Sequence, residues 1–253
     1  MDSDPLVVAA VAAWCFTVAL AGGAVGLVLG NIRLPVILLV ASSPAAGAGA
    51  NIGISGIAAL AAAGTHARAG RVNWRLFAWM APPSIVGAVA GSLAGGVLPS
   101  EILLAVIGAT LLWFGADLVR PRKEPLPVPD GTDLDLRAAA VSGGLVGLLG
   151  GLVGLILGAL RMPALLKNVG EAPARAVGTN LAVGVCVGAA GVAGHAPSGV
   201  DWALLAIGAG ASVPGALLGA RLTGRLSAAA LMRAIGAVLI VAGLATLASA
   251  FLR

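Results

Sequence analysis

Two arginines inside long apolar stretches are the first candidates for chemistry. Arg33 and Arg161 each end a segment that begins Gly-Gly-x-Val-Gly-Leu, and each is followed two positions later by a proline, Pro35 or Pro163. A guanidinium stays charged at neutral pH and can donate two parallel hydrogen bonds to one oxyanion. Ionisable side chains at membrane depth are rare and commonly functional, so the pair predicts anion binding or a gate. The alternative is an arginine whose charge reaches the membrane interface.

A second pair of polar positions follows each arginine, in Gly49-Ala50-Asn51 and Gly178-Thr179-Asn180. We expect both to lie where a helical hairpin is interrupted, so that the asparagine caps a new half-helix. The free N–H groups at such a helix start favour an anion. Simple capping, or hydrogen bonding between neighbouring helices, is the alternative. With two glycines whose backbone could approach a substrate, the predicted substrate-binding set is Arg33, Arg161, Asn51, Asn180, Thr179, Gly49, Gly178, Gly30 and Gly158.

Composition defines the setting of these residues. Of the 253 residues, 59% are hydrophobic and 10% charged, against roughly 25% charged in an ordinary soluble domain. This excludes a soluble globular enzyme, a disordered chain and a disulfide-stapled domain. The net charge of +5 forms no basic stripe, so we expect no nucleic-acid partner. We also predict no catalytic residue, metal or cofactor, because no HExxH, GxSxG or nucleotide-binding loop is present.

Long apolar runs predict a polytopic, all-α membrane protein. A spanning helix needs about 20 apolar residues, whereas strands of a membrane barrel alternate over about 10. Residues 120–137 are charged, rich in proline and unable to span. We therefore predict a first transmembrane repeat at 1–119, a cytoplasmic linker at 120–137 and a second repeat at 138–253. The long apolar runs cover 5–32, 34–65, 76–100, 102–116, 138–160, 176–200, 202–220 and 234–252.

The second half of the chain repeats the first. When segment 22–35 is placed over segment 150–163, nine of fourteen positions are identical, including both arginines. A register one position longer pairs Asn51 with Asn180. Equivalent loops differ in charge: the loop after residue 65 has three arginines, and the loop at 195–201 has no Lys or Arg. By the positive-inside rule, this predicts inverted repeats, each with spanning helices and a broken, re-entrant hairpin, as in secondary transporters.

Three further charged positions and two histidines lie outside this set. Lys167, Glu171 and Arg175 are spaced by four, which predicts salt-bridged loop residues; a vestibule that attracts anions is the alternative. We expect His66 and His195 to be solvated loop residues, with a pH-sensing role as the alternative.

The glycine-rich segments that end near a proline, the repeated half and the segment Ala176-Val177-Gly178-Thr179-Asn180-Leu181 resemble the TauE/SafE family of sulfite exporter-like permeases. The resemblance implies a secondary transporter that moves sulfite, sulfoacetate or a related organosulfonate across the bacterial inner membrane. A passive anion channel on the same scaffold is the alternative. The implied partners are the sulfur oxyanion, the lipid bilayer and a coupling ion, H⁺ or Na⁺; the oligomeric state is left open. The Gly-Asn-Ile-Arg and Gly-Ala-Leu-Arg segments depart from the family's denser glycine run, which is compatible with a different anion or with tighter binding of the same one.

Overall fold

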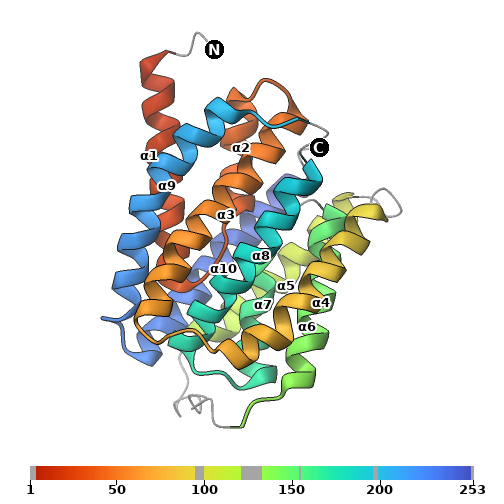
Figure 1. Cartoon of the computed structure of the whole chain (residues 1–253), viewed down its shortest axis with the longest axis vertical. Helices are drawn as coiled ribbons and strands as arrows, with labels where there is room; N and C mark the ends of the chain where they lie inside the picture. The colour runs from red at the N-terminus through yellow and green to blue at the C-terminus, as the bar shows by residue number, and fades with distance from the viewer. Residues whose placement is uncertain (1–3, 95–99, 121–132, 154, 196–198, 252–253) are drawn as a thin grey trace.

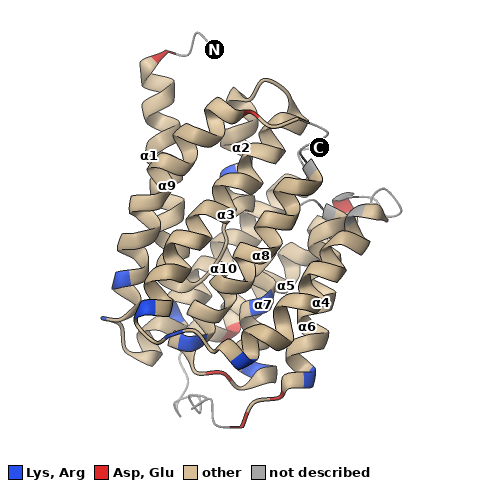
Figure 2. Ribbon diagram, in the orientation of Figure 1, with Lys and Arg blue, Asp and Glu red and all other residues tan. Residues whose placement is uncertain are grey.

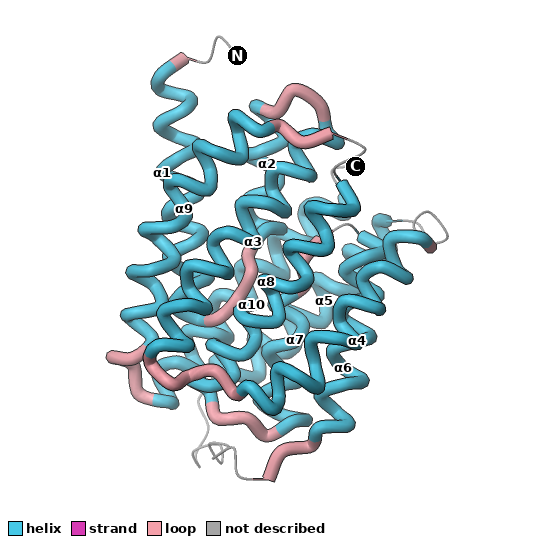
Figure 3. Tube along the Cα trace, viewed as in Figure 1, coloured by secondary structure: helices cyan, strands magenta, loops and turns pink. Residues whose placement is uncertain are grey.

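The computed structural model describes residues 4–94, 100–120, 133–153, 155–195 and 199–251, and these form helices joined by short loops (Figures 1 and 3). This agrees with the all-α prediction. Six of the described helices are long and apolar enough to cross a membrane, so the chain is a polytopic helical membrane protein. Most of the predicted linker, residues 121–132, lies outside the described part of the chain.

The helices of the two halves begin at corresponding positions. The register that places 22–35 over 150–163 also places the starts of α2, α4 and α5 on the starts of α7, α9 and α10. In the same register, α8 starts one position later than the counterpart of the start of α3. The first half contains α1 (Pro5–Val25), α2 (Gly30–Val40), α3 (Pro44–Arg68), α4 (Trp74–Leu93) and α5 (Ser100–Val119). The second contains α6 (Leu136–Val153), the short helix α7 (Gly158–Ala164), the π-helical turn η1 (Leu165–Val169), α8 (Pro173–His195), α9 (Trp202–Thr223) and α10 (Ala228–Phe251).

Each hairpin is interrupted earlier than the sequence analysis predicts. The first break lies at residues 41–43, where the Ser43 side chain caps α3 and Pro44 occupies its first turn. The second follows Gly170, which has a φ of +78°. A proline is well suited to a first helical turn because its φ is preset and its missing N–H has no partner there. The expectation that Asn51 and Asn180 cap new half-helices at the breaks is therefore wrong, since both lie inside α3 and α8.

The main helix pairs join one half of the chain to the other. Helix α1 packs along α9, and α4 packs along α6, while α3 packs on α8 and α5 on α10 (Figure 1). The first two pairs depend on glycine. A Cβ on Gly215 or Gly219 would lie within 3.0 Å of α1 backbone atoms, and a Cβ on Gly87 or Gly91 would lie within 3.0 Å of α6 backbone atoms. Small residues allow this close approach of helix backbones.

Most Lys and Arg residues gather at one end of the bundle, which is the lower end in Figure 2. We call it the Lys/Arg-rich end. The last turns of α1, α3 and α9 meet there, since His66 and Thr223 both contact the Gly23 carbonyl oxygen and Arg71 donates to the Ala220 carbonyl oxygen. Helices α4 and α8 begin there, where Asn73 contacts Glu171 and Thr179. Consequently α3 and its counterpart α8 run in opposite directions, as do α4 and α9 (Figure 1).

Candidate functional site

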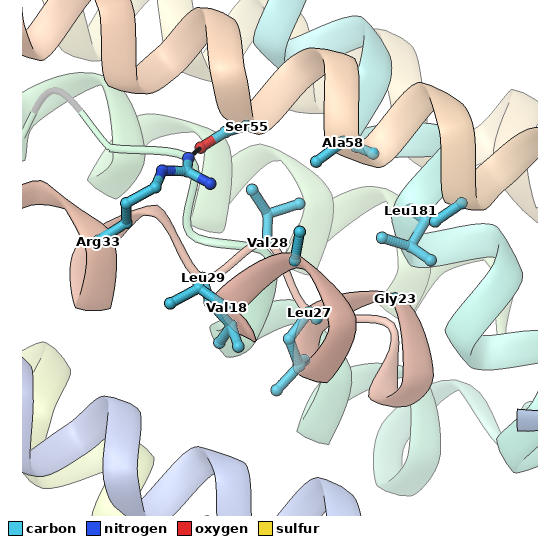
Figure 4. A pocket seen from close by; sticks show the side chains of 13 residues that line it. Val18, Gly23, Leu27, Val28, Leu29, Arg33, Ser55, Ala58 and Leu181 are labelled. Atoms are coloured by element: carbon cyan, nitrogen blue, oxygen red, sulfur yellow. Dashed lines mark hydrogen bonds between the residues drawn. The ribbon is translucent and has the colours of Figure 1, made fainter. Parts of the chain in front are cut away.

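Arg33 is buried and hydrogen-bonded to α3. Its Nε donates to Asn51 Oδ1 at 2.9 Å, and its Nη2 donates to the Asn51 carbonyl oxygen at 3.0 Å and to Ser55 Oγ at 2.5 Å. The Asn51 amide nitrogen in turn donates to the Gly30 carbonyl oxygen at 3.1 Å. Figure 4 shows the Arg33 side chain pointing from α2 to Ser55. The short helix α2 is thereby tied to α3 through its only charged side chain.

Arg161, the counterpart on α7, is equally buried, with 2% of its surface exposed. Its surroundings differ, because its Nε is buried with no hydrogen-bond partner. Asn180 donates from its amide nitrogen to the carbonyl oxygens of Gly26, at 2.7 Å, and Gly158, at 2.9 Å. The Asn180 Oδ1 is also buried without a partner. The bond that joins Arg33 to Asn51 thus has no counterpart in the second half.

Thr179 and Gly178 have structural contacts at the start of α4. The Thr179 hydroxyl oxygen accepts a hydrogen bond of 2.9 Å from the Asn73 backbone N–H. A Cβ on Gly178 would lie within 3.0 Å of the Arg71 carbonyl oxygen. Asn73 itself caps α4 by accepting from the Leu76 N–H at 3.1 Å. These two predicted site residues therefore join α8 to the loop before α4.

The three remaining predicted glycines lie near the asparagines. A Cβ on Gly30 would meet Ser55 Oγ at 2.9 Å, and one on Gly158 would meet the Val28 backbone nitrogen at 3.3 Å. Gly49 is buried in α3, two positions before Asn51. Because Gly30 and Gly158 have no side chain, the starts of α2 and α7 can lie close to polar groups of neighbouring segments of the same chain. Of the predicted set, Arg33, Asn51 and Gly30 share one group of contacts, and Arg161, Asn180 and Gly158 lie at the corresponding positions of the second.

Two cavities lie at equivalent places in the two halves, but they differ in size. The first has a volume of about 20 Å³ and lies beside the last turns of α1, with Arg33 and Ser55 on one side and Gly23 on the other (Figure 4). The second has a volume of about 490 Å³ and lies between α4, α6 and α8. Six lining residues of the first, Gly22, Gly23, Leu27, Val28, Ala58 and Ala62, correspond to Gly150, Gly151, Leu155, Ile156, Val187 and Gly191 in the second.

The cavities lie toward opposite ends of the bundle. The first is next to Gly23, at the Lys/Arg-rich end, where His66 Nε2 and Thr223 Oγ1 contact the Gly23 carbonyl oxygen. The second is lined by Leu93 and Gly194, at the ends of α4 and α8 that are remote from Asn73. The cavity at the Lys/Arg-rich end has room for about one water, and the other is much larger.

The sequence analysis missed two buried polar residues at the Lys/Arg-rich end. His66, expected to be solvated, is wholly buried in the last turn of α3. Glu171 is also wholly buried and accepts from the Asn73 amide nitrogen at 2.5 Å. The prediction that Glu171 and Arg175 pair is confirmed at 3.5 Å, and Lys167 pairs with Asp117. Burial of this kind depends on how the helix ends pack together, so the spacing of charges gives no signal of it.

Within the described part of the chain, no group of three His, Cys, Asp or Glu residues could hold a metal ion. The polar groups of the site are instead guanidinium, amide and hydroxyl groups with backbone carbonyls. Such a set can bind and orient an oxyanion but offers no activated nucleophile.

Comparison with known proteins agrees with this chemistry. No curated protein and no solved structure matches the chain. The model of the family described as sulfite exporter TauE/SafE matches residues 11–246, which include both arginines and all the described helices except parts of the first and last. The chain therefore belongs to the sulfite exporter TauE/SafE family, a family of membrane transporters and not of enzymes.

Proposed function

We propose that this protein is a secondary carrier of a small sulfur-containing oxyanion, such as sulfite, sulfoacetate or a related organosulfonate, in the bacterial inner membrane. It works by alternating access between two inverted repeats. The single observation that carries this proposal is the pair of equivalent cavities, about 20 Å³ and about 490 Å³, at opposite ends of one bundle. A carrier exposes one side at a time, and the exchange of conformation between equivalent repeats would close one cavity as the other opens.

The opposite directions of α3 and α8, and of α4 and α9, support the inverted arrangement (Figure 1). The Lys/Arg-rich end faces the cytoplasm by the positive-inside rule, so the larger cavity lies toward the outer side. A passive channel on this scaffold would need both cavities open together. The small first cavity, with room for about one water, favours the carrier.

Cysteine accessibility at two equivalent positions tests the proposal. In a chain with Cys15→Ala and Cys186→Ala, single variants Ala58→Cys and Val187→Cys place one thiol in each cavity. A membrane-impermeant thiol reagent added outside should label Val187→Cys and leave Ala58→Cys unlabelled. Reagent added inside should label Ala58→Cys slowly, because the first cavity has room for about one water. A saturating sulfur oxyanion should shift the two labelling rates in opposite directions.

Transport is measured by counterflow of sulfite in liposomes. A carrier accumulates labelled anion against unlabelled anion inside, whereas a channel equilibrates it without overshoot. Absence of any sulfur-oxyanion flux, or simultaneous fast labelling of both positions from their own sides, would contradict the proposed carrier.

A further inference from the structure

The two arginines occupy equivalent positions of the repeat but differ in their hydrogen-bond partners. Arg33 uses its Nε and Nη2 on Asn51 and Ser55. The residue that corresponds to Ser55, in the register that pairs Asn51 with Asn180, is Gly184. The second site therefore lacks the hydroxyl group that holds the guanidinium of the first.

The amide nitrogen of Asn180 also donates to other groups and not to Arg161. Its nitrogen faces two carbonyl oxygens, those of Gly26 and Gly158, and this fixes the orientation of the amide because only the nitrogen can donate. Gly26 belongs to the first repeat and has a φ of +73°, so its carbonyl is presented by the left-handed turn that ends α1. The result is a buried Asn180 Oδ1 with no donor and a buried Arg161 Nε with no acceptor.

The equivalent atoms of the first repeat, Arg33 Nε and Asn51 Oδ1, lie 2.9 Å apart. We therefore take the unpaired Arg161 donor and the unpaired Asn180 acceptor together when we consider the chemistry of a ligand. An uncompensated charge in a buried site is costly, so an anion that accepts from Arg161 relieves that cost. Oδ1 of Asn180 requires a donor, which a fully deprotonated oxyanion does not carry. A singly protonated oxyanion supplies both, with one oxygen to accept and one O–H to donate. Sulfite takes up a proton near neutral pH, whereas sulfate, thiosulfate and sulfonates stay unprotonated there.

We propose that Arg161 and Asn180 form the anion-binding subsite of the carrier, that its ligand is a singly protonated oxyanion of the hydrogen-sulfite type, and that Arg33 is a structural counterpart. The inference rests on the proposed function and names its site and substrate form. Arg161 and Asn180 do not themselves line the larger cavity; its lining includes Ile156, two residues before Gly158, and Val187, which follows Asn180 on α8.

Gly184→Ser is the sharpest test, because it gives Arg161 the partner that Arg33 already has. A Cβ at this position would meet the Val28 Cγ2 side-chain atom at 3.0 Å and the Ala59 Cβ at 3.8 Å, so small side-chain shifts accommodate it. Sulfite binding to the purified protein, measured by titration calorimetry, should weaken about tenfold, the effect of one charged hydrogen bond. The matched control is Gly210→Ser, the same change on α9 in open space, which should leave the affinity unchanged.

Arg161→Met covers the case in which Gly184→Ser fails to fold. It should abolish sulfite binding while the melting temperature stays at or above that of the wild type, because it removes a buried charged group whose Nε has no hydrogen-bond partner. Sulfite should bind the wild type roughly tenfold more tightly at pH 6 than at pH 8, since its protonated fraction falls with pH. Sulfate and thiosulfate should compete weakly at both values.

The failures of the two proposals are distinguishable. Wild-type counterflow of sulfite together with unchanged sulfite affinity in Gly184→Ser and Arg161→Met would overturn the subsite and support the carrier. Equal sulfite affinity at pH 6 and pH 8 would overturn the protonated ligand. Sulfite binding that depends on Arg161 and on pH as expected, without any counterflow, would support the subsite and contradict the carrier.

Discussion

Gly219→Ala places a methyl group where α9 touches the backbone of α1. A Cβ at Gly219 would lie within 3.0 Å of the carbonyl oxygen and carbonyl carbon of Leu20 and the nitrogen of Ala24. These are backbone atoms of a helix, so no flexible side chain can move aside. The contact can be relieved only if α1 and α9 separate until the methyl group reaches an ordinary distance of 3.4 Å or more.

Separation of the helices loses close contacts along the whole α1–α9 pair, where Gly215 makes a similar approach to Phe16. Overpacking of this kind costs about 1–3 kcal/mol. We take the upper value because the added methyl group meets backbone atoms of Leu20 and Ala24, which cannot move aside. Alanine recovers about 1 kcal/mol through its higher helix propensity. The net expectation is a loss of about 2 kcal/mol in the free energy of unfolding.

The assay is thermal unfolding in detergent, followed by the fluorescence of the tryptophans. Gly91→Ala, at the equivalent place on α4, should give the same loss, because its Cβ would meet the Leu148 carbonyl oxygen. Gly210→Ala on α9 is the control: no atom lies within 4 Å of its Cβ, so its melting temperature should stay level or rise. A Gly219→Ala protein as stable as Gly210→Ala would refute the close backbone packing of α1 and α9.

Two further predictions concern buried and capping charges. Arg33→Met should lower the free energy of unfolding by about 3 kcal/mol, because it removes three hydrogen bonds from a charged donor and leaves Asn51 Oδ1 unpaired. Chemical or thermal denaturation beside Arg161→Met, which should lose no stability, checks this, and equal losses in the two variants would contradict it. The pKa of Asp201 lies below its usual value because the Leu204 N–H donates to the carboxylate that caps α9. The stabilisation is therefore complete above the unfolded-state pKa of about 4 and is lost as the pH falls through the folded-state value. Asp201→Ala should cost about 1 kcal/mol at pH 7 and progressively less in acid, as measured by melting curves across pH; a cost that does not change with pH would rule out the carboxylate cap.

The class of fold could be predicted from sequence because it depends on long apolar runs and on a repeat that survives in glycine, proline and arginine. The register that pairs Arg33 with Arg161 reappears in the starts of α7, α9 and α10. The interruption of both hairpins was predicted, but the breaks lie before Asn51 and Asn180, since Ser43 and Pro44 begin α3 through local geometry.

The sequence analysis named the paired residues of the candidate site but not the difference between the contacts of the two pairs. The twin arginines and asparagines follow from the repeat, yet the difference between them depends on Ser55 and Gly184, a pair that becomes meaningful only when α2 and α3 are seen in contact. Likewise, burial of His66 depends on Gly23 and Thr223, which are far from it in sequence. Such contacts between distant residues depend on how the two halves pack together, so they cannot be predicted from the local spacing of residues.

The pairing of α1 with α9 also bears on how the protein is made. Helix α1 is complete at Val25, but its partner begins at Trp202, so at typical rates of synthesis roughly 10 to 40 seconds separate the two. Throughout that interval the face of α1 that will receive Gly215 and Gly219 has only lipid, or the insertion machinery, to contact. The delay is much shorter for α4 and α6, which pack together and are synthesised soon after one another. Assembly of the bundle should therefore begin with the α4–α6 pair, and α1 gains its partner only after α9 has been made.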